Sequence, residues 1–276
     1  MLFFVYKLDS DEITIKKKKF KSMLAAERQR RILDMLLKAE TVSTVGVAKD
    51  LGITAETARR DFETLEAEGR LSRRHGGAVC VDDSRRDLPL NSRERANVAA
   101  KREIAKLAVA QIEPGDTLFF DASSTVFHVA CLLSNIELTI LTSALKAAME
   151  LARRPAIQVI LLGGVVSHRS LSCQGALAES ALESYHVRKA FMSCRGVDGA
   201  RGASEANSEQ ADLKRKIVRV ADQTFLLADK TKMGLKSSFL FARMQEFDAL
   251  ITDCPPPKAV RKALDQGDGK VFINGG

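Results

Sequence analysis

The first recurring pattern along the chain is a helical spacing of apolar positions. From residue 27 a broad apolar stripe lies opposite a face of arginines, which predicts a helix that ends near residue 40. A second, short helix is expected at residues 44–51, with Gly52 as its C-terminal stop. Thr54 is a suitable N-cap for a third helix, which Gly69 closes. Its inward residues are spaced four and three: Ala58, Phe62 and Leu65. The pattern therefore predicts helix, tight turn, helix.

The third helix carries basic residues near its start, on the face opposite its apolar stripe. Glu56, Arg59 and Arg60 point away from the buried side on a helical wheel. A recognition helix meets the DNA major groove at this place, and arginine suits bidentate contact with guanine or contact with phosphate. The alternative is an ordinary solvated face, on which the arginines pair with Glu56 and Glu63.

The residues after the third helix form a basic hairpin. Residues 71–81 read as two short strands joined at Gly76-Gly77. Arg73, Arg74 and His75 lie on the approach to its tip. A hairpin in this position is a wing, which would contact the flanking DNA backbone or minor groove and supply phosphate affinity with little sequence information.

At this point the sequence resembles a known family. Thr54-Ala-Glu-Thr-Ala-Arg-Arg-Asp-Phe-Glu-Thr-Leu-Glu-Ala-Glu-Gly69, continued by Arg74-His-Gly-Gly-Ala78, looks like the helix-turn-helix signature of DeoR-type bacterial transcriptional regulators. The family usually has Ile or Val at the position of Ala58 and Leu at that of Phe62, which suggests local repacking. The resemblance implies operator contacts by Thr57, Arg59 and Arg60, with Asp61 orienting an arginine or capping locally. The candidate DNA-binding residues are Thr54, Glu56, Thr57, Arg59, Arg60, Arg73, Arg74 and His75.

A polar stretch without periodicity separates this module from the rest of the chain. Residues 81–90 contain a proline and read as a linker. The expected organisation is an irregular extension over residues 1–22, a winged helix-turn-helix over 23–81, a linker over 82–92 and an effector-sensing domain over 93–276. The extension ends in Lys16-Lys-Lys-Lys-Phe-Lys21, and these lysines could instead form a basic arm with affinity for phosphate.

Beyond residue 116, apolar β-rich runs alternate with amphipathic helical runs. The expected strands are residues 117–120, 138–141, 157–162, 189–193, 224–228 and 249–252. Continuous apolar strands linked by helices predict a mostly parallel α/β sheet. Ligands of such sheets bind at the carboxyl ends of the strands.

Polar motifs follow several of these strands. Asp121-Ala-Ser-Ser-Thr125 precedes a helix whose free N–H groups and dipole favour an anion such as phosphate. Its hydroxyls could instead merely cap that helix. Asp121 would repel phosphate, so we expect it to hold sugar hydroxyls. The candidate effector-binding residues are Asp121, Ser123, Ser124, Thr125, Thr142, Gly163, Gly164, Arg195, Glu209, Asp229 and Lys232. For any one of the charged residues, Lys214 on the same helix as Glu209 included, a surface salt bridge is the alternative.

Together these motifs resemble the DeoR effector domain, whose fold is related to ribose-5-phosphate isomerase. That domain typically senses phosphorylated sugars or sugar-like metabolites, and the resemblance spans about residues 23–255. It implies a DNA-binding repressor of sugar metabolism genes. An alternative is a sugar-phosphate isomerase with an appended DNA-binding module, in which Glu209 or Asp121 is the base and Lys232 holds the phosphate. A passive nucleic-acid-associated protein would leave the sensor motifs unexplained.

Composition narrows the class of protein without locating a site. The 276 residues are 45% hydrophobic and 28% charged, which excludes a collagen, a disulfide scaffold and wholesale disorder. No stretch approaches the ~20 apolar residues of a membrane span, and a secretory signal is not recognisable, so we expect a soluble cytoplasmic protein. The net charge of +8 suits a polyanionic partner, although residues 23–85 carry 11 basic and 11 acidic residues.

Two further expectations concern metals and assembly. The five cysteines are scattered and form no C-x-x-C pair, which favours reduced, structural cysteines without a metal, and no cofactor is expected. A single small winged module contacts too little DNA for an operator affinity of ~10⁻⁸–10⁻¹¹ M. We therefore expect a homo-oligomer that binds double-stranded operator DNA with paired modules.

Overall fold

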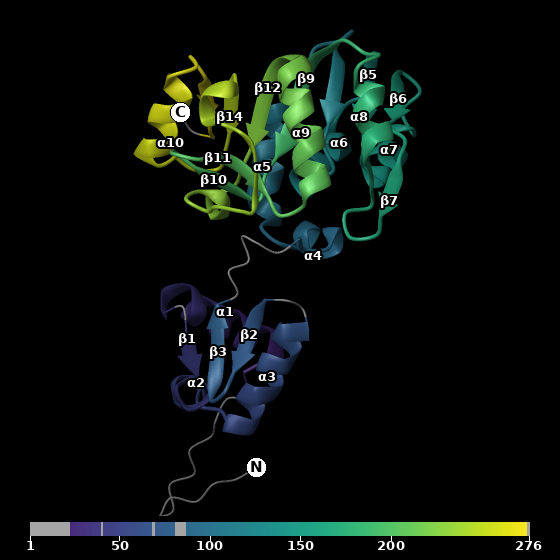
Figure 1. Cartoon of the computed structure of the whole chain (residues 1–276). Helices are drawn as coiled ribbons and strands as arrows, with labels where there is room; N and C mark the ends of the chain where they lie inside the picture. Colours follow the sequence, from purple (N-terminus) through teal and green to yellow (C-terminus); the bar gives the residue numbers. More distant parts are fainter. Residues whose placement is uncertain (1–22, 40, 68–69, 81–86, 275–276) are drawn as a thin grey trace, which may run out of the picture. The chain divides into compact units, whose positions relative to one another are not determined.

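The computed structural model describes residues 23–274 except 40, 68–69 and 81–86. Its internal contacts divide the chain into two compact units, one ending at Asp83 and the other beginning at Ser84 (Figure 1). The expected extension over residues 1–22, Gly69 and residues 82–86 of the expected linker lie outside the described residues. Among the helices that the structure describes, none has the length and apolar character to cross a bilayer.

The N-terminal unit is a winged helix-turn-helix. Its described helices are α1 (Ala25–Ala39), α2 (Thr44–Leu51) and α3 (Ala55–Ala67). Its described strands pair antiparallel in the order β1-β3-β2, with bounds β1 (Thr41–Ser43), β2 (Leu71–Arg74) and β3 (Gly77–Cys80). Gly52 ends α2 in the left-handed region at φ 64°, and the Thr54 hydroxyl accepts from the Thr57 N–H at 3.1 Å. Both expected helix signals are confirmed.

The core of this unit comes from the apolar stripes of all three helices. Ala58, Phe62 and Leu65 of α3 are fully buried, as expected, and pack with Ile32 and Leu36 of α1. The hairpin turn consists of His75 and Gly76, so the expected turn at Gly76-Gly77 is wrong by one residue. Gly76 has φ +82°, and a Cβ on Gly77 would lie 2.1 Å from the Val42 carbonyl oxygen. Both positions therefore require glycine.

The C-terminal unit is built on a parallel sheet. In the described part of the chain seven strands pair in the order β15-β14-β12-β9-β4-β5-β6, and every pairing is parallel. Their bounds are β4 (Thr117–Phe120), β5 (Leu138–Thr142), β6 (Ile157–Leu161), β9 (Val187–Ser193), β12 (Ala221–Leu227), β14 (Ala249–Ile251) and β15 (Lys270–Phe272). The expected fold class is confirmed, and β15 is an additional strand. Since β4 pairs with both β5 and β9, the strand order reverses between β4 and β9.

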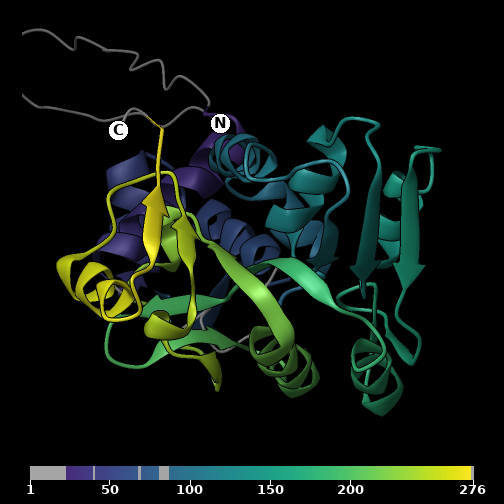
Figure 2. The same ribbon diagram turned by 90° about the horizontal axis from the view of Figure 1, so that it is seen from above.

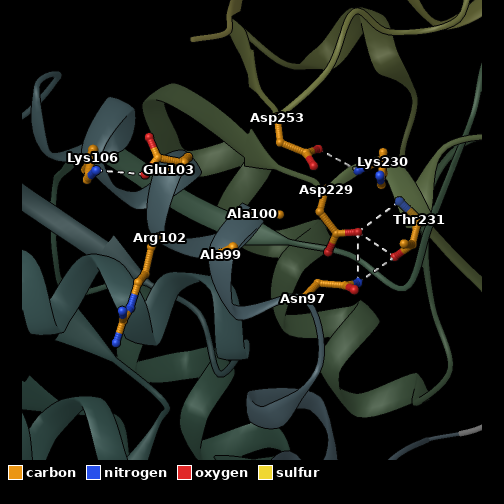
Figure 3. Close-up of a pocket in the computed structure, with 10 residues that line it drawn as sticks. All are labelled: Asn97, Ala99, Ala100, Arg102, Glu103, Lys106, Asp229, Lys230, Thr231 and Asp253. Atoms are coloured by element: carbon orange, nitrogen blue, oxygen red, sulfur yellow. Dashed lines mark hydrogen bonds and ion pairs between the residues drawn. The ribbon is translucent and has the colours of Figure 1, made fainter. Parts of the chain in front are cut away.

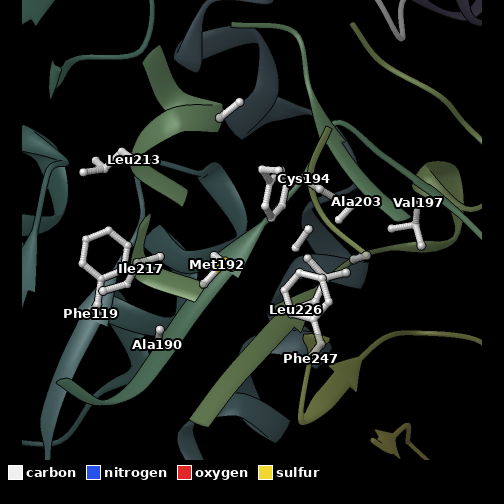
Figure 4. Packing of buried hydrophobic residues seen from close by; sticks show 14 of the residues in the cluster. Phe119, Ala190, Met192, Cys194, Val197, Ala203, Leu213, Ile217, Leu226 and Phe247 are labelled. Carbon is white, nitrogen blue, oxygen red and sulfur yellow. The ribbon is translucent and has the colours of Figure 1, made fainter. Parts of the chain in front are cut away.

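Helices cover both faces of this sheet (Figure 2). One face packs against α5 (Val98–Val109), α6 (Ser124–Leu132) and α7 (Leu145–Leu151), and the other against α8 (Ala176–Leu182), α9 (Ser208–Val220) and α10 (Lys258–Asp265). Neighbouring residues of β4 point to opposite faces. Phe119 packs with Ile217 of α9 (Figure 4), whereas Phe120 belongs to the cluster of Ile104 on α5.

Short accessory elements lie at the ends of the main strands. The strands β10 (Gly196–Asp198), β11 (Gly202–Glu205) and β13 (Phe239–Ala242) form a small antiparallel sheet, and β7 (Val165–Ser167) and β8 (Ser172–Gln174) form a hairpin. A 3-10 helix, η2 (Lys230–Lys232), follows β12. The expected linker is too long, because α4 (Leu90–Arg95) begins inside it and buries Leu90.

Candidate functional site

The exposed face of α3 carries the two expected arginines. The side chains of Arg59 and Arg60 are 61% and 77% exposed. Glu56 lies between them, 3.3 Å from Arg59 Nη1 and 3.6 Å from Arg60 Nε. Exposed pairs of this kind stabilise a fold by only ~0–1 kcal/mol, so both guanidinium groups can exchange Glu56 for a DNA phosphate or base at little cost. The ion pairs of a solvated face are thus compatible with a reading role.

The wing is tied to α3 by one of its arginines. Arg73 lies 2.7 Å from Glu63 and 2.8 Å from Glu66, and its backbone N–H also donates to Glu66. The hydrogen bond to Glu66 is the main cause that raises the pKa of Arg73. Arg74 and His75 are exposed at the tip. Arg73 therefore links the wing to the helix, and Arg74 and His75 are left open to solvent at the tip.

Asp61 orients an arginine, as the sequence suggested. Its carboxylate is buried on α3 and accepts from Arg28 Nε at 2.5 Å and Arg28 Nη2 at 2.9 Å. This bidentate pair raises the pKa of Arg28 and joins α1 to α3. It fixes the recognition helix from its buried side.

In the C-terminal unit a buried ionic triad lies at the carboxyl end of β4. Asp121 accepts the backbone N–H groups of Ser123 at 3.0 Å and Ser193 at 2.8 Å, and lies 2.9 Å from Lys214 Nζ. Lys214 also pairs with Glu205. Burial opposes the charge on Lys214, but the two carboxylates outweigh it and raise the pKa of this lysine. The triad of Asp121, Lys214 and Glu205 joins β4, β11 and α9.

The hydroxyl motif after β4 divides into structural and available groups. Ser123 accepts from the Val126 N–H at 3.1 Å and caps α6. Thr142 donates to the Phe120 carbonyl at 2.8 Å and accepts from the Ala144 N–H. Ser124 and Thr125 are buried in the first turn of α6, and no described residue forms a hydrogen bond with either hydroxyl. The capping alternative thus holds for Ser123, while the next two hydroxyls remain available.

A cationic group lies next to this triad. Burial lowers the pKa of Lys232, and Arg195 adds to the effect. Burial and the neighbouring Lys232 lower the pKa of Lys101 to about 8. Asp229 moderates this repulsion; its Oδ1 atom accepts from Thr231 and, at 3.3 Å, from Asn97 Nδ2. Its buried Oδ2 atom has no partner within the described part of the chain. We call Lys101, Arg195 and Lys232 the cationic cluster.

The same charges act on Cys194, which lies between the triad and the cationic cluster. Its thiol is fully buried, and burial raises its pKa to about 12, with Glu205 as the next cause. The four cysteines whose side chains the structure describes are free thiols. Cys194 is thus an inert apolar contact at the centre of the site.

Some expected residues lie elsewhere. Glu209 is exposed and contacts the hydroxyl of its neighbour Ser208, whereas Glu205 pairs with the buried Lys214. Gly163 and Gly164 are exposed at the end of β6, outside both charged groups. Sequence reasoning missed Lys101, although the signal was present. Lys101 shares one face of α5 with the apolar residues Ile104, Ala105 and Ala108, and a lysine on such a face is buried.

Two hollows border the site. An open groove of about 740 Å³ runs between α5 and the residues that follow β12 and β14 (Figure 3). Asn97, Asp229 and Thr231 lie at one end of it and Lys106 at the other. Beside Asp121 and Lys214 lies a small hollow of only about 10 Å³, enough for one water molecule.

The winged module and the parallel α/β domain define the class of a two-domain DNA-binding regulator, and comparison with known proteins identifies the family. Residues 28–84 match the DeoR-like helix-turn-helix domain, and residues 96–254 match the DeoR C terminal sensor domain. The chain belongs to the DeoR family of transcriptional regulators. It is 41% identical to the "Uncharacterized HTH-type transcriptional regulator YulB" of Bacillus subtilis (strain 168), over 90% of this chain and 96% of that protein.

Two further relatives carry names that describe regulation in opposite directions. The chain is 31% identical to the HTH-type transcriptional repressor GlcR of Bacillus subtilis, over 91% of this chain and 97% of that one. It is 30% identical to the L-fucose operon activator of Escherichia coli (strain K12), over 83% and 96%. A solved ribose 5-phosphate isomerase A from Methanocaldococcus jannaschii matches 51% of this chain and 56% of its own, with 17% identity and a TM-score of 0.39. The protein is a DNA-binding transcriptional regulator and not an isomerase with an appended module.

Proposed function

We propose that the sensor domain binds a phosphorylated sugar at the carboxyl edge of its sheet and that binding changes the operator affinity of the winged module. The cationic cluster carries this proposal. Lys101 is a buried charged group and Lys232 a half-buried one, and the lowered pKa of each reflects the cost of removing its charge from water. A phosphate dianion would relieve it. The first turn of α6, which follows the carboxyl end of β4 and carries Ser124 and Thr125, adds N–H and hydroxyl donors at the same edge of the sheet.

The sugar hydroxyls fall to the acidic side of the same edge. Asp121 and Glu205 share the ammonium group of Lys214, so this side carries an excess negative charge that repels phosphate. Carboxylate oxygens can accept hydrogen bonds from sugar hydroxyls. The unpartnered Oδ2 atom of Asp229 is a further acceptor. The names of relatives such as the L-fucose operon activator support a sugar as the ligand class.

On the DNA side, Arg59 and Arg60 are proposed to read base edges or phosphates in the major groove, beside Thr57. Thr54 and Glu56 stand at the same helix start, where the Thr54 and Thr57 hydroxyls are 2.8 Å apart. Arg74 and His75 are proposed to contact the flanking backbone. We propose a repressor that acts in the cytoplasm, where its operator DNA lies.

We propose that the protein works as a homo-oligomer, because paired modules raise operator affinity through effective concentration. Light scattering at micromolar concentration tests this assembly. A monomer that still binds one operator tightly would contradict it.

Residues 1–22 are proposed to be dispensable. Full-length protein and a chain that starts at Met23 should show equal operator affinity and salt slope, whereas a slope lowered by several units after truncation would assign their lysines to DNA.

A thermal-shift screen tests the effector proposal. The full chain is heated with ribose 5-phosphate, glucose 6-phosphate or fructose 1-phosphate, and with the free sugars and inorganic phosphate as controls. A ligand at a hundred times its Kd stabilises by about 2.7 kcal/mol. A hit is then added to the complex with an operator duplex selected from random DNA. Absence of any phosphorylated hit, or a hit without effect on operator affinity, contradicts the proposal.

Two variants test the site itself. Lys232→Ala and Ser124→Ala should abolish the response of operator binding to the hit and leave effector-free DNA binding near normal, because neither residue belongs to the winged module. Lys262→Ala, an exposed lysine on α10, is the matched control and should respond like the wild type. If both site variants respond normally, the effector binds elsewhere.

A further inference from the structure

The segment that carries the chain into the sensor domain is pinned along the proposed effector site. Residues 87–101 comprise α4 and the first turn of α5. The Leu90 N–H donates to the Arg169 carbonyl at 2.8 Å, and Arg169 Nη1 donates to the Asp87 carbonyl at 3.0 Å. Lys146 of α7 pairs with Glu94 at 2.6 Å. Every covalent path from the sensor to the winged module runs through this segment.

The bend between α4 and α5 depends on Asn97. This residue lies in the left-handed region at φ 54°, ψ 36°, which a residue with a Cβ adopts only when its surroundings hold it there. Its carboxamide supplies that hold, because Nδ2 donates to Thr231 Oγ1 at 3.1 Å and to Asp229 Oδ1 at 3.3 Å (Figure 3). Asp229 is a proposed effector ligand, and Thr231 precedes the cationic Lys232 in the chain.

Lys101 ties the same bend from the other side. Its ammonium group donates to the Ala96 carbonyl at 2.7 Å and to the Arg93 carbonyl. The buried Nη2 atom of Arg93 has no hydrogen-bond partner among the residues that the structure describes. Lys101 thus serves two functions: it caps the end of α4, and it belongs to the cationic cluster that we assign to phosphate.

We propose that residues 87–101 form a latch that competes with the effector for Asp229 and Lys101, so that effector binding frees the α4–α5 bend and changes the operator affinity of the winged module. The proposal rests on the effector site proposed above. The latched and released states are the two states that a sensor needs.

The latch predicts the effect of breaking it, whether the effector weakens or strengthens operator binding. A change that breaks the latch populates the released state without ligand. The broken-latch protein should therefore resemble the effector-bound wild type in operator affinity. It should also bind the effector more tightly than the wild type does, because less free energy is spent on release.

Asn97→Ala and Asn97→Gly test the latch in the full chain. Both remove the carboxamide, but glycine accepts φ 54° without strain, so an effect common to both belongs to the side-chain contact and not to the backbone. Asn91→Ala, on the exposed side of α4, is the matched control. Hydrogen exchange without ligand should be faster at residues 88–97 in both Asn97 variants and unchanged in the strands of the sheet. Operator affinity should shift toward the effector-bound value, within the usual coupling range of about 5- to 150-fold.

The outcomes separate the two proposals. If the wild type responds to a sugar phosphate while both Asn97 variants match Asn91→Ala in exchange and operator affinity, the latch is overturned and the effector site stands. Wild-type behaviour of Asn97→Gly alone would assign the effect of Asn97→Ala to backbone strain, which also overturns the latch. If no sugar phosphate changes operator binding by the wild type, the proposed function fails, and the latch fails with it.

Discussion

Charged side chains dominate both working surfaces, yet their surroundings are opposite. On α3 the side chains of Arg59 and Arg60 are mostly in water and meet Glu56 at 3.3 and 3.6 Å. At the sheet edge, Asp121 and Lys214 are 2% and 4% exposed and lie 2.9 Å apart. An exposed pair is exchanged easily, whereas a buried one is costly to break. The exposed face of α3 is thus suited to exchanging its ion pairs for contacts with a partner. The buried pair at the sheet edge keeps the same geometry whether or not a ligand is bound.

Removing Lys214 should give the largest effect. Lys214→Ala leaves Asp121 and Glu205 buried without their cation, which destabilises by ~3–5 kcal/mol. Urea unfolding of the full chain should show the midpoint of the C-terminal unit falling. Lys262→Ala should stay within ~0.5 kcal/mol of the wild type. A loss below about 1 kcal/mol for Lys214→Ala would mean that the triad is solvated and that the two surfaces do not differ as described.

On the exposed surface the effect should appear in binding and not in stability. Arg59→Ala or Arg60→Ala should weaken specific operator binding by ~1–3 kcal/mol if the side chain reads a base. If it contacts phosphate, all DNA sequences should lose affinity alike and the salt slope should fall by about one unit. Titrations of specific and random duplexes at several salt concentrations distinguish these cases.

Arg30→Ala is the matched control for this surface, because Arg30 is an exposed arginine on α1. It should bind DNA like the wild type. Unchanged operator binding in both α3 variants, with the fold intact by circular dichroism, would reject α3 as the recognition helix.

A smaller effect concerns protons at the cationic cluster. In the free protein Lys101 has a pKa of about 8, and a bound phosphate dianion should raise it toward its ordinary value. Effector binding near pH 9 should therefore take up part of a proton, whereas below pH 7 the lysine is already charged and uptake should vanish. Calorimetry in two buffers of different ionisation enthalpy measures this uptake. Zero proton uptake across pH 7–9.5 would mean that the bound effector does not lie close enough to Lys101 to raise its pKa.

The smallest effect is expected at the wing. Arg73→Ala removes two exposed ion pairs, each worth ~0–1 kcal/mol, and should lower operator affinity slightly and equally for all sequences. Fluorescence anisotropy with specific and random duplexes measures it. A selective loss on the specific duplex would assign base reading to Arg73 and remove its structural role.

The sequence predicted the elements whose buried positions form a clear local pattern and missed those without one. Helices and strands with strong apolar periods were located to within a few residues, because burial fixes their pattern locally. The strand β15 (Lys270–Phe272) was missed because three residues, none of them buried, carry no period. The strands β10 and β11 were missed because they are short and begin with glycine.

The candidate site required knowledge of strand order. The exposed arginines of α3 follow from a local motif, but Asp121 meets Lys214 only because β4 lies beside β9 in the sheet. Asn97 and Asp229 meet across 132 positions. The sequence pointed to Glu209 and not to Glu205, because it did not locate the start of α9, and four residues separate the end of β11 from the exposed first turn of α9.

The link between Arg73 and the two glutamates of α3 has a consequence for how the module docks. Leu71 of β2 shares a buried core with Leu65 of α3, and Arg73 adds its two ion pairs at the edge, so we expect wing and helix to approach DNA as one preorganised shape. Little conformational freedom is then lost on binding. The spacing between major-groove reading and wing contact is also fixed, so a one-base-pair slip, about 3.4 Å along the axis, would misalign both contacts together. Operators should accordingly tolerate base changes under the wing far better than insertions between the two contacts.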